Sequence, residues 1–296
     1  MDAMNLSYLR LGDTIGICSP SHVVDGAVLD SITGLLQSFG FKVKAGEHIL
    51  CKDWGYCATK EQRAADFNQL ARDPKVRMVL FGGGESSNEL LPLLDYQAMA
   101  AKPKLYCSYS DGTNILQAIH CQTGLPVFYG PTPHTLLEED SYTLEQFDAL
   151  TSDHVPYRAA EPWTVLVPGT AHGEFTGGYL RNFALMLGCK YFTYKQKPYI
   201  LFLEDHEQFT EVGGVAEYLE FIAQTPFMSQ VTGLLFGHYS DARQPDLLGI
   251  LERFGRRFSI PVAYCHDFGH GAHHAIIPIG MDGELDTKRQ QLVWNY

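Results

Sequence analysis

Thr14-Ile15-Gly16-Ile17-Cys18 is a short apolar run, and an amphipathic run at residues 28–39 follows it. The first half of the chain repeats this alternation, with strand-like runs at 42–43, 77–81, 104–108 and 127–129 and helical runs at 60–72 and 113–120. Short apolar runs that alternate with amphipathic helices are typical of βαβ units, whose strands form a parallel sheet. The sequence therefore predicts an α/β fold whose first half is a doubly wound parallel sheet.

The second half of the chain has more strand-like segments than the first. They lie at 199–203, 233–236, 261–264 and 275–279, and helical runs lie at 180–187, 215–224 and 246–254. Between the two halves the pattern weakens into a charged stretch with a possible helix at 144–150. We predict an N-terminal domain at 1–140, a linker at 141–165 and a strand-rich C-terminal domain at 166–296.

The composition excludes several classes of protein. Of the 296 residues 45% are hydrophobic, which is typical of a globular chain rather than a disordered one. The 34 acidic and 22 basic residues give a net charge of -12, which repels the phosphates of nucleic acids and anionic lipids. No run reaches the roughly 18 apolar residues of a membrane helix, and residues 1–13 lack the apolar core of a secretory signal. We expect a cytoplasmic protein that binds neither nucleic acid nor membrane.

A glycine-rich turn follows the predicted strand at 77–81. It reads Gly82-Gly83-Gly84-Glu85-Ser86-Ser87-Asn88. In open α/β sheets ligands bind beyond the carboxyl ends of the strands, and glycines there let backbone N–H groups approach a ligand. The turn lacks the Lys-Ser/Thr pair of a P-loop and the glycine spacing of a dinucleotide fingerprint. It is either part of a ligand site or a turn that serves only backbone geometry.

A serine lies in the turn after the predicted strand at 104–108, in the run Ser108-Tyr109-Ser110-Asp111-Gly112. This run approximates the Gly-x-Ser-x-Gly nucleophile elbow, which exposes a serine hydroxyl on a sharp strand-to-helix turn. The N–H of Asp111, with a second N–H from the glycine turn, would then face the oxygen of an attacked carbonyl. The alternative is that Ser110 and Asp111 cap the following helix.

Candidates for a base and its partner carboxylate follow two strands of the second half. Glu204-Asp205-His206-Glu207 comes after 199–203, and a carboxylate there could orient an imidazole. His266-Asp267-Phe268-Gly269-His270-Gly271 comes after 261–264, with His273 and His274 nearby. The order Ser110, Glu204, His270 makes a catalytic triad possible. Solvated loops and a metal site in the histidine loop are the alternatives, although no H-E-x-x-H motif is present.

Taken together and in this order, several segments resemble the LD-carboxypeptidase family of serine peptidases, which includes the microcin C immunity peptidases. The segments lie at 12–21, 63–68, 83–88, 90–96, 109–111, 177–180, 201–205, 268–270 and 278–280. The resemblance implies a triad of Ser110, Glu204 and His270 and an oxyanion hole of backbone N–H groups at Gly84 and Asp111. It also implies substrate contacts at Gly83, Ser87, Asn88 and Tyr109.

The same resemblance implies a fold and a reaction. The N-terminal domain would be flavodoxin-like and carry the serine, and a smaller C-terminal domain would carry the glutamate and histidine, with the site between them. The protein would be a homodimer without metal or cofactor. Its substrate would be a small peptide or a peptidyl-nucleotide. Family members release D-alanine from murein tetrapeptide, whereas the immunity branch cleaves an amide that links an amino acid or peptide to a modified adenylate.

The sequence departs from the murein-recycling members in two places. Phe81 and three glycines replace their usual glycine turn, which is closer to the immunity branch, and Ser108 replaces a glycine. Trp163 lies where the immunity branch carries an aromatic residue that stacks on a base, although a buried tryptophan is the alternative. A non-catalytic peptide- or nucleotide-binding module and a metal-dependent hydrolase remain the rival functions.

Overall fold

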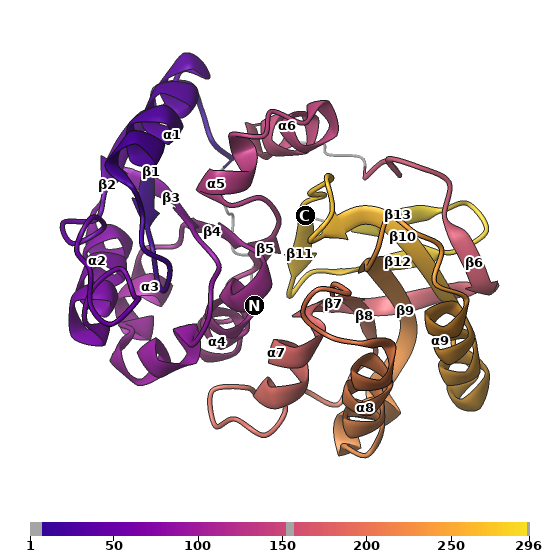
Figure 1. The fold of residues 1–296 in the computed structure, drawn as a ribbon. Helices are drawn as coiled ribbons and strands as arrows, with labels where there is room; N and C mark the ends of the chain where they lie inside the picture. Colours follow the sequence, from indigo (N-terminus) through magenta and orange to yellow (C-terminus); the bar gives the residue numbers. More distant parts are fainter. Residues whose placement is uncertain (1–7, 152–156, 295–296) are drawn as a thin grey trace. The chain divides into compact units, whose positions relative to one another are not determined.

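The chain divides into two units, Met1–Val155 (unit 1) and Pro156–Tyr296 (unit 2), which Figure 1 shows in a computed structural model. The structure describes residues 8–151 and 157–294. Part of the predicted linker, residues 152–156, lies outside the described residues. The domain boundaries given above stay predictions.

Parallel strands form the sheet of unit 1. In the order in which they pair, they are β5 (Val127–Tyr129), β4 (Leu105–Ser108), β3 (Val76–Phe81), β1 (Thr14–Cys18) and β2 (Lys42–Ala45). This order is that of a flavodoxin-like doubly wound sheet. The predicted fold class is confirmed for this half of the chain.

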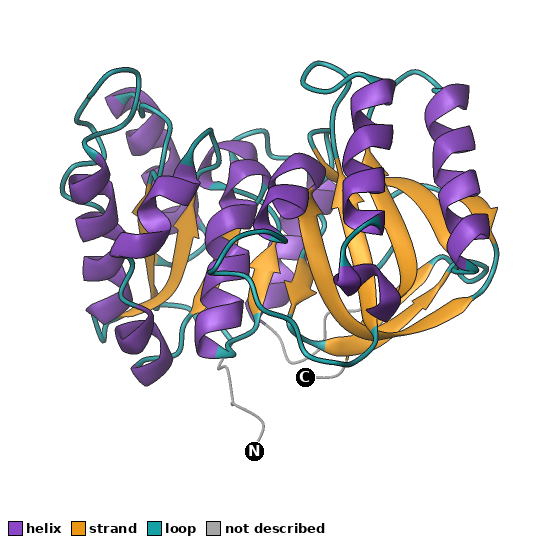
Figure 2. Cartoon of the chain, turned by 90° about the horizontal axis from the view of Figure 1, so that it is seen from below, coloured by secondary structure: helices purple, strands orange, loops and turns teal. Residues whose placement is uncertain are grey.

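The helices of unit 1 follow the predicted alternation with strands. Figure 2 shows the helices in purple and the strands in orange. They are α1 (Gly26–Ser38), α2 (Lys60–Arg72), α3 (Tyr96–Ala101), α4 (Thr113–Thr123), α5 (Pro133–Leu136) and α6 (Ser141–Asp148), with 3-10 turns η1 (Ser87–Leu93), η2 (Ser110–Gly112) and η3 (Ala149–Thr151). A capping box starts α2, because the Thr59 hydroxyl accepts the N–H of Gln62 and the Gln62 side chain accepts that of Thr59.

Unit 2 contains a mixed sheet with a parallel centre. The pairing order is β13 (Gln291–Trp294), β12 (Asp282–Asp286), β7 (Thr170–Tyr179), β8 (Tyr199–Glu204), β9 (Val231–His238), β10 (Val262–Gly269) and β6 (Thr164–Val167). Strands β7 to β10 are parallel, whereas β12, β13 and β6 pair antiparallel. The strand-rich character predicted for this half is confirmed, and the short β11 (Ile277–Ile279) lies before β12 in the chain.

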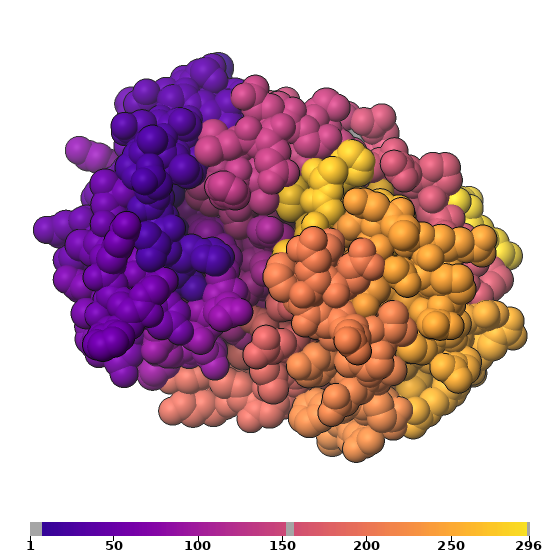
Figure 3. All heavy atoms as spheres, viewed as in Figure 1, coloured from indigo at the N-terminus to yellow at the C-terminus, as the bar shows by residue number. Residues whose placement is uncertain are grey.

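Helices α7 (Leu180–Met186), α8 (Val212–Ala223) and α9 (Pro245–Phe258) and the turn η4 (Pro226–Gln230) complete unit 2. The outward side chains of α8 and α9 are visible at the surface in Figure 3. Helix α9 buries Leu247, Leu251 and Phe254, which lie on one helical face, while Arg256 pairs with Glu252 on its outer face. In the described residues no helix is long and apolar enough to cross a membrane.

The parallel order decides where the functional residues lie. The carboxyl ends of neighbouring parallel strands lie at one edge of a sheet. In unit 1 this edge carries the glycine turn after β3 and Ser110 after β4. In unit 2 it carries Glu204 at the end of β8 and His270 directly after β10. Each unit therefore gathers its candidate residues at one edge of its own sheet.

Candidate active site

Ser110 lies in the sharp turn between β4 and α4. Its φ is 56°, in the left-handed region that costs a non-glycine residue about 1–2 kcal/mol. Its N–H donates to the hydroxyl of Tyr129 at 3.0 Å, and the N–H of Gly112 donates to the carbonyl of Tyr109 at 3.0 Å. Strain of this kind, held by surrounding hydrogen bonds, is typical of a nucleophile elbow. Tyr129, at the end of β5, is a supporting residue that the sequence analysis did not single out.

The side chain of Asp111 links the serine turn to the glycine turn. Its Oδ2 accepts the N–H of Ser87 at 2.8 Å, and its backbone carbonyl accepts the Ser87 hydroxyl at 2.9 Å. The N-cap residue of α4 is Gly112, so neither Ser110 nor Asp111 occupies the position that the helix-cap alternative assigns to them. Ser87 is buried, and it lies at the junction of the two turns.

The glycine turn packs closely against Ser110 and Ser21, which leaves little room for side chains. A Cβ on Gly83 would lie 3.2 Å from the Cβ of Ser110 and 3.2 Å from the carbonyl oxygen of Tyr109. Gly84 has a φ of 139°, and its Cβ would lie 2.3 Å from the hydroxyl of Ser21. Within the described residues the structure gives neither glycine N–H a hydrogen-bond partner. Unit 1 therefore brings Gly83, Ser87, Tyr109, Ser110 and Asp111 together, while Asn88 is exposed.

Glu204 and His270 form a buried pair in unit 2. Glu204 has no exposed surface, and its Oε2 lies 2.8 Å from Nδ1 of His270. A Cβ on Gly269 would lie 2.9 Å from the same oxygen, so a glycine before His270 allows this approach. The ring of Tyr179, from the end of β7, contacts the imidazole edge-on at 5.2 Å between centroids. The solvated-loop alternative is therefore wrong for Glu204.

The surroundings of His270 favour its charged form. Burial alone would lower the pKa of His270, but the charge and hydrogen bond of Glu204 and the charge of Asp205 outweigh it, so the pKa is raised. A carboxylate bonded to Nδ1 fixes the tautomer in which Nε2 can accept a proton. The pair has the geometry of a base with its orienting carboxylate.

The family follows from a comparison of the sequence with family models. The model of the LD-carboxypeptidase N-terminal domain matches residues 15–130, and that of the C-terminal domain matches residues 172–285. The chain belongs to the LD-carboxypeptidase family. The family resemblance stated from the sequence is confirmed.

Individual relatives span nearly the whole chain. A Treponema pallidum protein provisionally named a carboxypeptidase is 30% identical and covers 94% of this chain and 90% of its own length. The murein tetrapeptide carboxypeptidase of Pseudomonas aeruginosa is 25% identical over 93% and 94% of the two chains. The microcin C7 self-immunity protein MccF of Escherichia coli is 26% identical over 96% and 93%. A structure of MccF in complex with aspartyl sulfamoyl adenosine superposes with a TM-score of 0.87 at 25% identity, covering 99% of each chain.

Further histidines of unit 2 lie beside the family's predicted base. The rings of His206 and His238 stack at 5.6 Å, and Nδ1 of His238 lies 2.9 Å from Nδ1 of His266. Burial and the neighbouring His266 lower the pKa of His238 to about 4. His266 and Asp267 lie inside β10, so placing them in a loop was wrong: the strand runs to Gly269, five residues beyond the predicted end. Among the described residues no three His, Cys, Asp or Glu are grouped to hold a metal ion.

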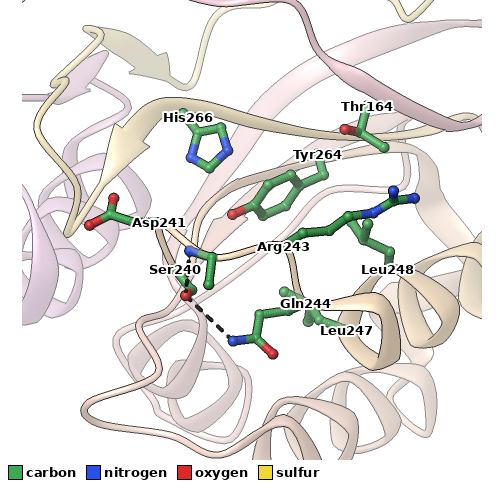
Figure 4. A pocket seen from close by; sticks show the side chains of 10 residues that line it. Thr164, Ser240, Asp241, Arg243, Gln244, Leu247, Leu248, Tyr264 and His266 are labelled. Carbon is green, nitrogen blue, oxygen red and sulfur yellow. Dashed lines mark hydrogen bonds between the residues drawn. The ribbon is translucent and has the colours of Figure 1, made fainter.

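A cavity of about 450 Å³ opens beside this histidine group (Figure 4). Its lining includes Ser240, Arg243, Gln244, Tyr264 and His266. The sequence analysis missed it because the predicted strand at 233–236 stops short of the end of β9, so the residues after that end were not inspected. The extended apolar run Val231–His238 was the available signal.

Trp163 is buried in unit 2. Its Nε1 donates to Oδ2 of Asp267 at 2.6 Å, and its side chain keeps 5% of its surface exposed. Tyr157 donates to the same carboxylate oxygen. The suggested stacking of Trp163 on a base is therefore wrong, because its faces pack in the interior. The buried alternative is the one observed.

Proposed function

We propose that the chain is a serine carboxypeptidase that hydrolyses an amide bond near a free carboxylate by acyl transfer. Ser110 is the nucleophile, His270 the base and Glu204 the residue that orients His270. The buried hydrogen bond between Glu204 and His270 carries the proposal, because a carboxylate that holds an imidazole at Nδ1 sets the tautomer in which Nε2 accepts a proton. The left-handed turn at Ser110 supports it, since strain of this kind is typical of a nucleophile elbow, and Ser110 keeps 9% of its surface exposed.

The reaction has two halves. Nε2 of His270 takes the proton of the Ser110 hydroxyl while Oγ attacks the scissile carbonyl carbon, and the imidazolium then protonates the leaving nitrogen. Water attacks the resulting ester with His270 again as base, which releases the acid and restores Ser110. Glu204 stays ionised throughout and stabilises the imidazolium. Side chains supply the nucleophile and the base, so the proposed chemistry needs no metal or cofactor.

Backbone N–H groups stabilise the oxyanion in this proposal. The N–H of Asp111 follows the nucleophile, as in other elbow sites, and Gly84 supplies the second donor. The close packing of Gly83 against Ser110 supports this arrangement, because it brings the glycine turn to the nucleophile. Substrate contacts at Gly83, Ser87, Asn88 and Tyr109 belong to the same proposal.

We propose murein tetrapeptide as the substrate, cleaved to tripeptide and D-alanine. The relative from Pseudomonas aeruginosa is named for this activity. An aminoacyl or peptidyl adenylate is the second candidate, favoured by the match to MccF over 99% of the chain and by its complex with aspartyl sulfamoyl adenosine. A homodimer and a cytoplasmic location stay predictions.

Mass-spectrometric turnover of both substrates, by wild type and by Ser110→Ala, tests the proposal. We expect wild type to release D-alanine from the tetrapeptide and Ser110→Ala to lose at least about 1,000-fold in rate with an unchanged melting midpoint. Cleavage of aspartyl sulfamoyl adenosine alone would move the substrate to the second candidate. Binding without cleavage of either would contradict the proposal and favour the binding module.

A further inference from the structure

Asp205 is a second buried carboxylate directly beside Glu204. It follows the last residue of β8 and has no exposed surface. Its Oδ1 accepts the N–H of His206 at 2.8 Å. Its Oδ2 is buried and has no hydrogen-bond partner among the residues that the structure describes. Buried polar groups are nearly always paired, so an unpaired carboxylate oxygen at this place needs an explanation.

The groups around Asp205 come from four parts of unit 2. From its own segment they are Glu204 and His206. Three further groups come from other strands: Tyr179 ends β7, Tyr239 follows β9 and His270 follows β10. The negative charge of Asp205 raises the pKa of each of them. The side chain of Thr210 also approaches the carboxylate and favours its charged form, but less than burial and Glu204 oppose it. Of these groups the two histidines, His206 and His270, can carry a positive charge, and His270 is the base of the proposed reaction.

The surroundings of Asp205 disfavour its negatively charged form. Burial and the negative charge of Glu204 raise the pKa of Asp205 to about 7. A carboxylate that only stabilised the fold would gain from full pairing, as Asp267 does with Tyr157 and Trp163. Asp205 lacks such pairing, so its charge, when present, acts on the groups around it, including His270.

We propose that Asp205 is a positioning residue of the hydrolytic site, whose negative charge adds to that of Glu204 and strengthens His270 as the base. This inference rests on the proposed function. When Asp205 takes up a proton, His270 keeps one carboxylate neighbour with a full charge instead of two. The loop that follows Asp205 also carries Phe209, whose ring contacts that of His270 at 5.1 Å. Asp205 thus acts through His270 and does not touch the substrate.

The variant Asp205→Asn removes the charge and keeps the shape. Loss of a neighbouring negative charge lowers the pKa of His270, so the acid limb of the pH profile of kcat should move to lower pH by about one unit. A weaker base should reduce the plateau of kcat about 3- to 10-fold, with KM unchanged. Wild type should show two coupled ionisations on that limb and Asp205→Asn one.

The matched control is Asp241→Asn. Asp241 is fully exposed, and its Oδ1 lies 3.8 Å from Nε2 of His238, which is outside the proposed triad. The same change of acid to amide there should leave the acid limb and kcat as in wild type. A shift in both variants would mean that net charge, and not the place of Asp205, sets the profile, and this would overturn the proposal.

Histidine NMR measures the pKa of His270 directly, without any turnover of substrate. The imidazole titration of His270, assigned from its loss in His270→Gln, should move to lower pH in Asp205→Asn and stay in Asp241→Asn. Should Asp205→Asn fail to fold, the carboxyl carbon of Asp205 in wild type should titrate near pH 7. An unmoved His270 in the variant, or an Asp205 that titrates near its ordinary value, would overturn the inference. Failure of the proposed function shows separately, as absent or Ser110-independent hydrolysis.

A purely structural role of Asp205 would have a different effect on the stability of the fold. The pKa of Asp205 is raised in the folded state, so the folded protein holds the proton that the unfolded chain releases, and stability falls as pH rises from about 4 through about 7. Asp205→Asn should remove this dependence and keep a melting midpoint at pH 8 at least as high as that of wild type. A marked fall of the midpoint would mean that the carboxylate serves the fold, which contradicts the proposal.

Discussion

At the scale of single residues, Glu204 explains why His270 suits the proposed role of base. The carboxylate has no exposed surface and accepts from Nδ1 of His270, so it holds the ring in one orientation and one tautomer. The same charge raises the pKa of His270 against the effect of burial. The two effects are separable, because a glutamine can accept the hydrogen bond but carries no charge.

Glu204→Gln should therefore lower kcat about 1,000- to 10,000-fold, as loss of the triad acid does elsewhere. Residual activity should show its acid limb at lower pH than wild type, because the carboxylate that raises the pKa of His270 is gone. The measurement is kcat/KM on the tetrapeptide between pH 5 and 9. An unmoved limb, or a loss below tenfold, would contradict the role given to Glu204.

At the scale of elements, the glycine turn and the serine turn are coupled by direct contacts. Gly83 packs against Ser110, and Ser87 binds Asp111, so a displacement of either turn moves the other. The site depends on the absence of a side chain at position 83 as much as on any group present. A small added side chain should therefore impair catalysis while the sheet beneath remains intact.

Gly83→Ala should reduce kcat roughly 100-fold, because a 1 Å displacement of a catalytic group has effects of this size. Gly34→Ala is the control: Gly34 lies in α1, where an added Cβ meets nothing within 4 Å. That change should leave kcat unchanged and raise the free energy of unfolding by about 0.8–1 kcal/mol, the helix propensity difference. Equal activity of the two variants would show that the turn tolerates a side chain.

A two-residue turn in unit 1 carries unusual strain. Trp54 and Gly55 have φ of 48° and 89°, and the flanking Asp53 and Tyr56 exchange backbone hydrogen bonds of 2.9 and 2.8 Å. Asparagine and glycine are the usual residues at the first position of such a turn, and a bulky residue there is an outlier. The indole is 96% exposed, so burial does not offset the cost.

Trp54→Asn should consequently stabilise the protein by about 1 kcal/mol, because asparagine tolerates the left-handed region. Urea unfolding of wild type, Trp54→Asn and Trp54→Ala measures this, and Trp54→Ala separates loss of the indole from relief of strain. The midpoint of Trp54→Asn should lie above that of Trp54→Ala. Equal midpoints would mean that the turn stores no strain.

Much of the element pattern could be predicted from the sequence. The predicted ranges of β1, α2 and β5 coincide with those observed, because short apolar runs bounded by turn residues and a capped amphipathic helix are local signals. Strand β7 was missed because it contains three glycines. A Cβ on Gly173 or Gly177 would lie 2.7 or 1.8 Å from the backbone of the adjacent segment at 198–202, a tertiary reason that no local pattern reveals.

At the scale of the whole molecule, chain topology decides which distant residues meet. Glu204 and His270 are 66 positions apart, and the parallel strands β8, β9 and β10 bring their carboxyl ends to one edge. The residue types and the rule for strand ends could be read from the sequence, so both residues were predicted. The order of the strands could not, so Asp205 was not identified as a neighbour of His270.

The proposed chemistry also makes a prediction for the complete enzyme in solution. Turnover of the tetrapeptide should be unaffected by a chelator such as EDTA, because a serine and a histidine supply the nucleophile and the base. The measurement compares initial rates before and after prolonged dialysis against EDTA. A rate that is lost on dialysis and restored by zinc would favour the metal-dependent alternative.

Covalent labelling shows whether His270 activates the hydroxyl of Ser110. A fluorophosphonate reacts with a serine only when a neighbouring base activates its hydroxyl, and the adduct is read by intact mass and peptide mapping. We expect a single adduct on Ser110 in wild type and none in His270→Ala. No adduct in folded wild type, or equal labelling of Ser110 without His270, would contradict it.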